Sequence, residues 1–192
     1  SSKLIKYPIA FNVRVLKEKG LLKVGKGTYG TPIIDSYRGS ESVITIGNYS
    51  SIAPNVRIIA GGLHPTSSIS QYPFRSKFSL KGQYEDGNPF TKGNINIGSD
   101  VWIGTGVTIL SGVNIGDGVI IGANSLVSRN IPDYAVAFGT PAASVSYRFS
   151  NEQIKALKAI SWWNWNEQKI VECVDDLTSE DIQSFINKYS ER

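Results

Sequence analysis

Branched aliphatic residues return at every sixth position along the middle of the chain. The series begins at Ile97 and ends at Val127, and a second series follows it four places later, from Val101 to Ile131, with Ser125 as its one exception. An α-helix repeats every 3.6 residues and a plain strand alternates by two, so neither keeps a six-residue period on one face. A fixed short period in a β-rich sequence predicts a solenoid in which each short strand is followed by a turn.

Three six-residue units complete one coil if each unit forms one side of a triangle. Residues 97–132 then form two coils, and each inward aliphatic lies against its equivalent in the next coil. Glycine follows several inward residues, as at Gly98 and Gly104, where we expect it to relieve crowding and to permit backbone angles that other residues avoid. The pattern therefore predicts a mainly β fold, in which stacked strands form a triangular tube.

The six-residue pattern has one long interruption. It starts at Ile46-Gly47, breaks near Gly61-Gly62 and resumes at Ile97, and residues 63–94 carry no such frame. Loops of this length inside a compact domain are uncommon and are often functional. We therefore expect residues 63–94 to leave the solenoid as an excursion loop.

The two ends of the chain follow other patterns. Residues 1–23 form an N-terminal segment with an expected short helix, and residues 24–149 hold the solenoid. In residues 150–192, aliphatics recur at helical spacing after a capping box of Ser150 and Gln153, which predicts a C-terminal helical segment. Three tryptophans in this segment are expected to cover the open end of the solenoid, where strand edges need protection: Trp162, Trp163 and Trp165.

Composition excludes several classes of protein. The net charge of +4 comes with scattered lysines, which indicates no nucleic-acid surface but suits a pocket for a phosphorylated small molecule. The single cysteine, Cys173, allows no internal disulfide, so we expect a buried structural thiol and a cytoplasmic protein. No apolar run approaches the roughly 20 residues of a membrane span, although peripheral association with a membrane stays open.

The only histidine, His64, is the strongest candidate for chemistry. It lies where the solenoid pattern breaks, directly after Gly61-Gly62 and Leu63, and an aromatic segment, Tyr72-Pro73-Phe74, follows it in the expected loop. A neutral imidazole can take a proton from a hydroxyl group at physiological pH. His64 is therefore a candidate general base.

Five motifs, taken together and in order, resemble those of one family. They are Ile46-Gly47-Asn48-Tyr49-Ser50-Ser51-Ile52-Ala53, His64 with Ser70-Gln71-Tyr72-Pro73-Phe74, Ile97-Gly98-Ser99-Asp100-Val101-Trp102-Ile103-Gly104, Gly139-Thr140-Pro141-Ala142, and Trp162-Trp163-Asn164-Trp165. The chain is similar in these motifs to the hexapeptide-repeat acyltransferases, and within them to the xenobiotic branch that holds chloramphenicol and streptogramin acetyltransferases. The resemblance covers about residues 24–170.

The resemblance implies a fold and a reaction. The fold would be a left-handed parallel β-helix of hexapeptide repeats with a long excursion loop and a C-terminal α-helical segment; the left hand comes from the resemblance alone. The reaction would be direct transfer of acetyl from acetyl-CoA to a hydroxyl, with His64 as general base and no metal. The family also implies a homotrimer with active sites between subunits.

Matching positions extend the implied site. The residues that match family contacts to acetyl-CoA are Trp102, Gly104, Thr105, Ala123, Ser128, Arg129 and Arg148. Arg129 and Arg148 would meet phosphates through bidentate guanidinium contacts, or would instead be exposed surface residues of the solenoid. Trp102 is too large for the tube interior and is expected to face outward. Three residues are candidates for acceptor binding, and the last two are alternatively loop core: Tyr37, Tyr72 and Phe74.

Two rival functions and one open question remain at this point. A zinc enzyme on the same scaffold, of the γ-carbonic anhydrase kind, needs three histidines and the chain has one. A non-catalytic solenoid for binding or trimerisation leaves the histidine and the long loop unexplained. The acceptor, an antibiotic or a sugar or surface polysaccharide, stays open, because Leu63 and Pro65 beside His64 depart from the xenobiotic pattern and His-Pro is more typical of the sugar branch.

Overall fold

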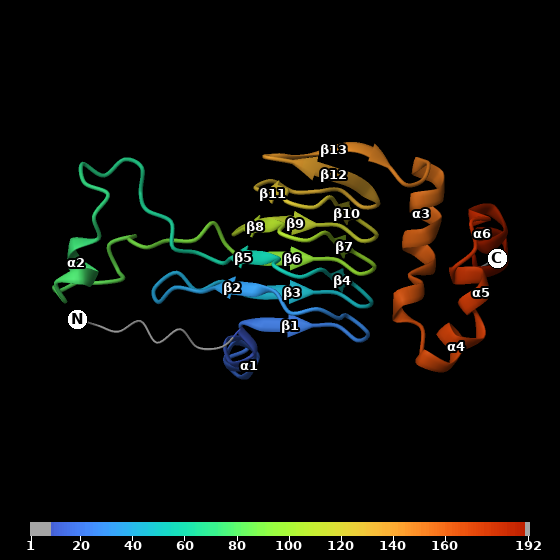
Figure 1. Ribbon diagram of the computed structural model, residues 1–192, viewed down its shortest axis with the longest axis horizontal. Helices are drawn as coiled ribbons and strands as arrows, with labels where there is room; N and C mark the ends of the chain where they lie inside the picture. The colour runs from blue at the N-terminus through green and yellow to red at the C-terminus, as the bar shows by residue number, and fades with distance from the viewer. Residues whose placement is uncertain (1–8, 191–192) are drawn as a thin grey trace.

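Short parallel strands stack on the three sides of a triangular tube in the computed structural model, which describes residues 9–190 (Figure 1). The first face consists of β1 (Leu22–Val24), β3 (Ile44–Ile46), β6 (Ile95–Ile97) and β9 (Asn114–Ile115). The second face consists of β4 (Ser51–Ile52), β7 (Trp102–Ile103), β10 (Ile120–Ile121), β12 (Ala135–Gly139) and β13 (Ala142–Tyr147). The third face consists of β2 (Ile33–Asp35), β5 (Arg57–Ile59), β8 (Thr108–Leu110) and β11 (Leu126–Val127).

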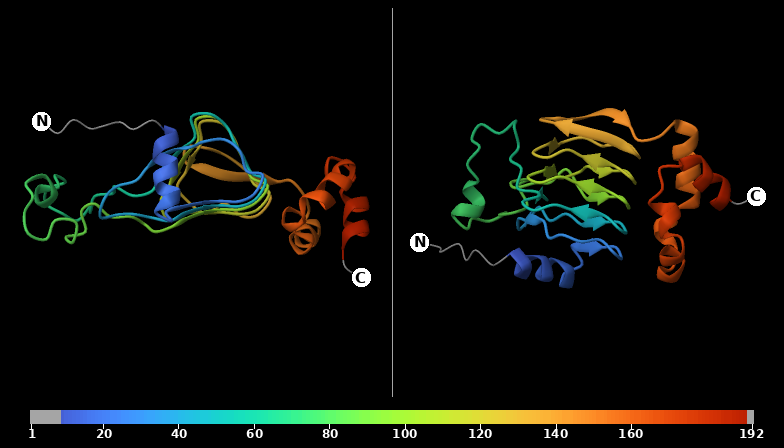
Figure 2. Two further views of the ribbon diagram at one scale, coloured as in Figure 1. Left: turned by 90° about the horizontal axis from the view of Figure 1, so that it is seen from below. Right: turned by 45° about the vertical axis from the view of Figure 1, so that its right-hand side comes forward.

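Seen along its axis, the tube is a triangle with a different feature at each corner (Figure 2). The excursion loop leaves between the third and first faces, at residues 60–62, and we call this the loop corner. The C-terminal helices lie against the turns between the first and second faces, which we call the helix corner. The turns between the second and third faces, which hold Thr105 and Ala123, form the open corner.

The register of the strands confirms the predicted coils. Ile97 pairs with Ile115 and Ile103 with Ile121, and the side chains of Asn96 and Asn114 bond across a separation of 18 residues, which is three six-residue units. The inward aliphatics of both predicted series are buried along the axis and form one continuous core. The six-residue period therefore specifies the stacking directly.

The glycines after the inward residues correct one part of the sequence interpretation. A Cβ at Gly98 would lie 2.6 Å from an oxygen of Asp117, and one at Gly104 would lie 2.7 Å from the amide nitrogen of Ala123. Neither glycine has a positive φ, so relief of crowding, and not freedom of the backbone, explains them. Positive φ occurs instead two places further on at the helix corner, for example at Asp100.

A ladder of side chains runs up the helix corner. The amide of Asn48 donates to Ser99 Oγ at 3.0 Å, the amide of Ser99 to Asp117 Oδ1 at 2.7 Å, and the amide of Asp117 to Asp133 Oδ1 at 2.7 Å. Each coil thus supplies an acceptor for a turn amide that no strand can satisfy. Lys158 bonds both aspartates; burial opposes its charge, but these two partners outweigh that cost and raise its pKa.

The C-terminal helices are α3 (Asn151–Ile160), η1 (Trp162–Asn164), α4 (Glu167–Glu172), α5 (Val174–Leu177) and α6 (Ile182–Tyr189). The predicted capping box of Ser150 and Gln153 begins α3. The prediction that the tryptophans cover the end of the tube is wrong. All the C-terminal helices pack along the side of the tube, at the helix corner (Figure 1). There Trp162 contacts Tyr49, with ring centroids 5.5 Å apart.

Other elements cover the two ends of the tube. Helix α1 (Ile9–Glu18) packs under β1 and β2, while residues 1–8 of the predicted N-terminal segment lie outside the described residues. At the other end, β13 turns back antiparallel to β12 after Gly139. The final strand therefore reverses direction and closes the edge that another parallel strand would have left open. No helix among residues 9–190 is long and apolar enough to cross a bilayer.

The core packing predicts that substitutions at two neighbouring residues differ clearly in their effect on stability. Ile109 is fully buried and its neighbour Thr108 faces outward. We expect Ile109→Ala to lower the free energy of unfolding by about 2–5 kcal/mol, because it leaves a cavity in a continuous core. Thr108→Ala is the matched control, with an expected change within about 0.5 kcal/mol. Urea unfolding measures both, and equal losses would contradict the inward and outward assignment.

Candidate active site

The excursion loop is fastened at its base, directly beside His64. Leu63 and Phe90 exchange two backbone hydrogen bonds of 3.0 and 2.8 Å, which hold the two ends of the loop together. Gly62 has φ +80°, and a Cβ on it would lie 2.7 Å from the ring of Tyr37. Only glycine suits both the backbone angle and this contact. The loop corner therefore brings Tyr37 close to the strand that carries His64.

A backbone carbonyl orients the imidazole of His64. Its Nδ1 lies 2.6 Å from the carbonyl oxygen of Gln71, and because a carbonyl only accepts, Nδ1 carries the proton in this contact. The side-chain amide of Gln71 donates to the carbonyl of Pro65 at 2.8 Å and closes the same turn. In the neutral ring, Nε2 is then the acceptor, and it has no hydrogen-bond partner among the described residues.

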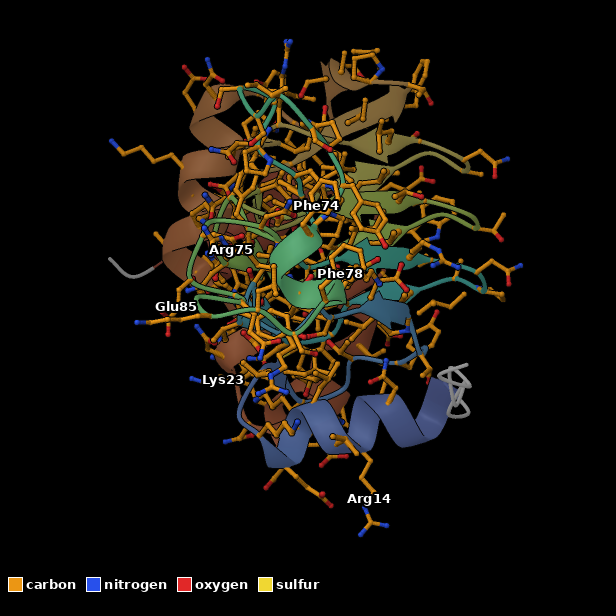
Figure 3. The ribbon with its side chains drawn as sticks, turned by 90° about the vertical axis from the view of Figure 1, so that its left-hand side faces the viewer. Arg14, Lys23, Phe74, Arg75, Phe78 and Glu85 are labelled. Atoms are coloured by element: carbon orange, nitrogen blue, oxygen red, sulfur yellow. The ribbon has the colours of Figure 1, made fainter. Side chains whose placement is uncertain are left out.

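Aromatic side chains gather on the loop next to this imidazole. Tyr72 directly follows the carbonyl that holds His64, and its ring contacts Phe74 edge-on with centroids 4.9 Å apart. Phe74 begins the short helix α2 (Phe74–Lys77) and stacks on Phe78 at 5.9 Å. All three rings stay about half exposed, and Figure 3, viewed from the loop side, shows Phe74 and Phe78 in front of the coil. Tyr72 and Phe74 are two of the three predicted acceptor residues, and the third, Tyr37, lies against Gly62 at the same corner as His64.

The residues predicted to contact acetyl-CoA divide into separate groups. Trp102 faces outward from the second face and is 57% exposed. Gly104, Thr105 and Ala123 lie together at the open corner, where the amide of Asn124 donates to the carbonyl of Thr105 at 2.9 Å. These four predicted residues therefore form one continuous region that runs from the second face to the open corner.

The other three members of that set lie elsewhere. Ser128 and Arg129 follow β11 at the loop corner, and the guanidinium of Arg129 is exposed. Arg148 lies at the helix corner, where it donates to the carbonyl of Gly118 at 2.8 Å and pairs with Asp100 at 3.3 Å. One chain therefore brings Ser128 and Arg129 to the same corner as His64, but leaves the other predicted acetyl-CoA residues at other places on the tube.

Two features of the site have no signal in the sequence. The carbonyl of Gln71 and the pairing of Leu63 with Phe90 are backbone contacts, and any residue except proline offers the same groups. The motif at residues 70–74 places Gln71 close to the candidate base but does not say which atom meets it. Among residues 9–190, no three histidine, cysteine, aspartate or glutamate side chains lie grouped as metal ligands would.

Comparisons with known proteins agree with this architecture. A family model described as bacterial transferase hexapeptide (six repeats) matches residues 94–129. The chain is 40% identical to a probable macrolide acetyltransferase of Lysinibacillus sphaericus, over 78% of this chain and 85% of that protein. It is 30% identical to a chloramphenicol acetyltransferase of Agrobacterium fabrum, over 72% of this chain and 68% of that protein.

A solved structure gives the same picture. A hexapeptide-repeat-containing acetyltransferase from Vibrio cholerae O1 biovar eltor, complexed with acetyl coenzyme A, is 25% identical, with a TM-score of 0.52 over 68% of this chain. The chain spans 62% of the length of that protein. With the three parallel sheets described above, these matches confirm the predicted left-handed parallel β-helix of hexapeptide repeats.

The contact with Gln71 predicts one tautomer of His64. We expect the neutral ring to carry its proton on Nδ1, because the carbonyl can only accept. With one histidine in the chain, ring-nitrogen chemical shifts from NMR report this residue alone. Gln71→Ala keeps the carbonyl and is expected to keep the tautomer, whereas a proton found mainly on Nε2 would contradict the geometry.

Proposed function

The chain belongs to the hexapeptide-repeat acetyltransferases, in their xenobiotic branch, and on that premise we propose that it transfers acetyl from acetyl-CoA to a hydroxyl of a small organic acceptor. His64 is the general base of this proposal. The observation that carries it is the hydrogen bond from Nδ1 to the carbonyl of Gln71, which leaves Nε2 as an acceptor at the surface of the loop corner.

The proposed reaction is a direct transfer. Nε2 of His64 takes the proton of the acceptor hydroxyl as its oxygen attacks the thioester carbonyl carbon. The C–S bond then breaks, the acetyl group stays on the acceptor oxygen, and the proton on His64 passes to the leaving thiolate. Cys173, the only thiol, lies between α4 and α5 in the C-terminal helices, so it does not suit the role of an acetyl carrier.

The division of the predicted residues supports a site made by more than one copy of the chain. His64 and the aromatic rings lie at the loop corner with Ser128 and Arg129, whereas Trp102, Thr105 and Ala123 lie on the second face and the open corner. We infer a homotrimer in which the loop corner of one subunit faces the open corner of the next. A ring of three such contacts closes and leaves no unpaired surface of either kind.

The acceptor surface suits a molecule with an apolar face. Tyr72, Phe74 and Tyr37 expose aromatic area beside the base, and aromatic rings contribute large contact area at little entropic cost. The two curated relatives described above are a probable macrolide acetyltransferase and a chloramphenicol acetyltransferase. We propose an apolar, hydroxyl-bearing xenobiotic as the acceptor class. A comparison of a macrolide, chloramphenicol and a galactoside as acceptors tests this class, and turnover of the galactoside alone would contradict it.

Two variants of His64 test its proposed role. His64→Ala should lower turnover by about 10²–10⁴-fold, since it removes the general base. His64→Asn retains a donor near the position of Nδ1 but has no comparable base, and we expect the same loss. Thiol release from acetyl-CoA in the presence of acceptor measures both.

The asparagine variant separates catalysis from support of the loop. If His64 only held the loop in place, His64→Asn would keep most of the activity and His64→Ala would lose it. That outcome would contradict a general base at this position. An unchanged far-UV spectrum and unfolding midpoint in both variants would establish that the loss is chemical.

A further inference from the structure

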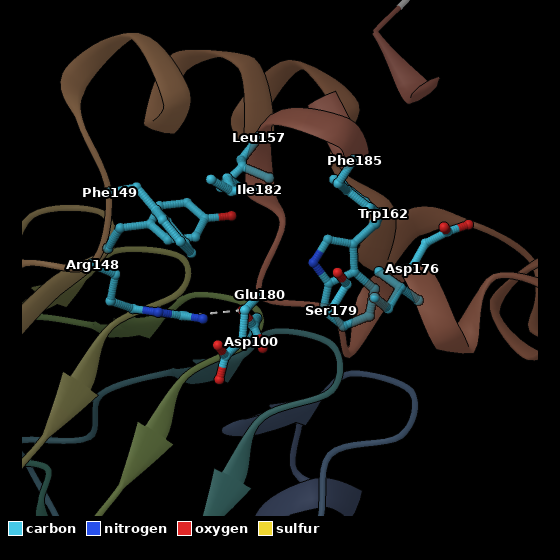
Figure 4. Close-up of a pocket in the computed structure, with 12 residues that line it drawn as sticks. Asp100, Arg148, Phe149, Leu157, Trp162, Asp176, Ser179, Glu180, Ile182 and Phe185 are labelled. Carbon is cyan, nitrogen blue, oxygen red and sulfur yellow. Dashed lines mark hydrogen bonds and ion pairs between the residues drawn. The ribbon is translucent and has the colours of Figure 1, made fainter. Parts of the chain in front are cut away.

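A cavity lies at the helix corner, at the opposite end of the first face from His64. It has a volume of about 360 Å³ and lies between the turns of the solenoid and the C-terminal helices (Figure 4). The solenoid contributes Asp100, Tyr134 and Arg148, and the helices contribute Trp162 and Phe185. The proposed acetyl transfer uses none of these residues. Arg148 was expected from the sequence to contact acetyl-CoA, but it lies here instead.

The cavity follows from one column of turn residues. Tyr49, Asp100, Gly118 and Tyr134 occupy the same turn position in successive coils, each with a positive φ. The ring of Tyr134 covers Gly118, and the ring of Tyr49 covers Gly27 one coil below its own level. The residue one coil above Asp100 is Gly118, which has no side chain to cover Asp100. The helices therefore bridge a hollow there, and Arg148 fills only its rim by bonding Asp100 and the carbonyl of Gly118.

The cavity contains a buried polar group with no partner. Tyr134 is 2% exposed, and its hydroxyl makes no hydrogen bond among the described residues. A buried hydroxyl without a partner costs stability, so such a group in a native protein needs an explanation. Burial, with the nearby charge of Asp100, raises the pKa of Tyr134, so the group stays a neutral hydroxyl that can donate or accept.

The charges around the cavity favour a cation. Three carboxylates line it, Asp100, Asp176 and Glu180, against one cationic side chain, Arg148. Asp176 is already paired with Lys188 at 2.7 Å and with the hydroxyl of Tyr189 at 2.6 Å. Glu180 forms no ion pair within residues 9–190. Burial raises the pKa of Asp100 although Arg148 opposes the shift, so its anionic form would gain from a further positive charge.

The walls of the cavity are apolar and largely aromatic. Phe149, Leu157, Trp162 and Phe185 face it, and the ring of Phe149 also contacts Tyr134 with centroids 5.7 Å apart. Aromatic faces attract organic cations through the ring quadrupole, most strongly at tryptophan. An apolar wall with a few polar groups is the usual composition of a small-molecule site.

We propose that this cavity binds a protonated organic amine with a compact apolar body. The body would lie against Trp162, Phe149 and Phe185, and the ammonium would face Glu180 and Asp100. With a small shift of the cavity wall, the oxygen of Tyr134 would accept a hydrogen bond from the ammonium, which would give this hydroxyl the partner it lacks within the chain. The site is independent of acetyl transfer and stands whether or not His64 is the general base.

Three probes that differ in charge test the proposal. They share a phenyl group and are 2-phenylethylammonium, 2-phenylethanol and 3-phenylpropionate, titrated into the full chain by isothermal calorimetry with the fluorescence of tryptophan as a second readout. We expect the ammonium to bind more tightly than the alcohol and the carboxylate to bind least. Equal binding of all three, or tightest binding of the carboxylate, would overturn the proposal.

A pair of charge variants locates the site. Glu180→Gln should lower the affinity for 2-phenylethylammonium by about two- to fivefold, which is the range for a partly exposed ion pair. Glu167→Gln makes the same change outside the cavity, in the first turn of α4, and should leave the affinity unchanged. If both variants weaken binding equally, the effect is one of net charge and the assigned site is wrong.

Tyr134→Phe separates a ligand role from a structural role. It removes only the hydroxyl, so the unfolding midpoint of the free protein should stay level or rise, because an unpartnered buried group is lost. The same variant should lower the affinity for 2-phenylethylammonium by about two- to tenfold, as the loss of one hydrogen bond predicts. A lower midpoint with unchanged binding would show that the hydroxyl serves the fold and would contradict the proposal.

Discussion

Each coil must place its inward aliphatics directly on those of the next coil, and this stacking constrains everything else in the molecule. The repeat of 18 residues leaves little freedom on the three faces, where strands pair in register along the axis. Even the residue after each inward side chain is constrained, because a Cβ at Gly98 would meet the coil above at 2.6 Å. The three corners are less constrained by this stacking than the faces, and each corner carries a different feature.

The loop corner is where the coil is interrupted, and the proposed catalytic site lies at this interruption. The pairing of Leu63 with Phe90 lets the chain leave the tube and return without loss of register. His64 follows at once, so its backbone lies next to the fastened base of the loop while its ring is oriented by the carbonyl of Gln71. Rigid support for a residue on a loop is a common way to position catalytic groups. The helix corner instead carries the polar ladder, the C-terminal helices and the cavity between them and the tube.

The sequence predicted the coils well, because a period of six residues reports stacking directly. It also predicted the place of His64, since a break in a regular pattern is visible without a structure. It could not predict the hydrogen bond to Gln71, because backbone carbonyls have no signature. The tryptophans and Arg148 show the limit of local patterns. The tryptophans were expected to cover the end of the tube but pack along the helix corner. Arg148 was expected to contact acetyl-CoA but pairs with Asp100 at the same corner. Both placements depend on how the C-terminal helices turn back on the tube, which no local spacing encodes.

The central claim is that the site joins His64 of one copy to the acetyl-CoA residues of the next, and mixed assemblies test it most directly. His64→Ala and Trp102→Ala chains would be mixed in equal amounts and assayed at limiting acetyl-CoA, where each variant alone should be impaired. If subunits share sites in a ring, about one quarter of the sites regain both residues after random mixing, and activity rises toward that fraction of the wild-type rate. Activity no greater than the average of the two separate variants would contradict a site shared between copies.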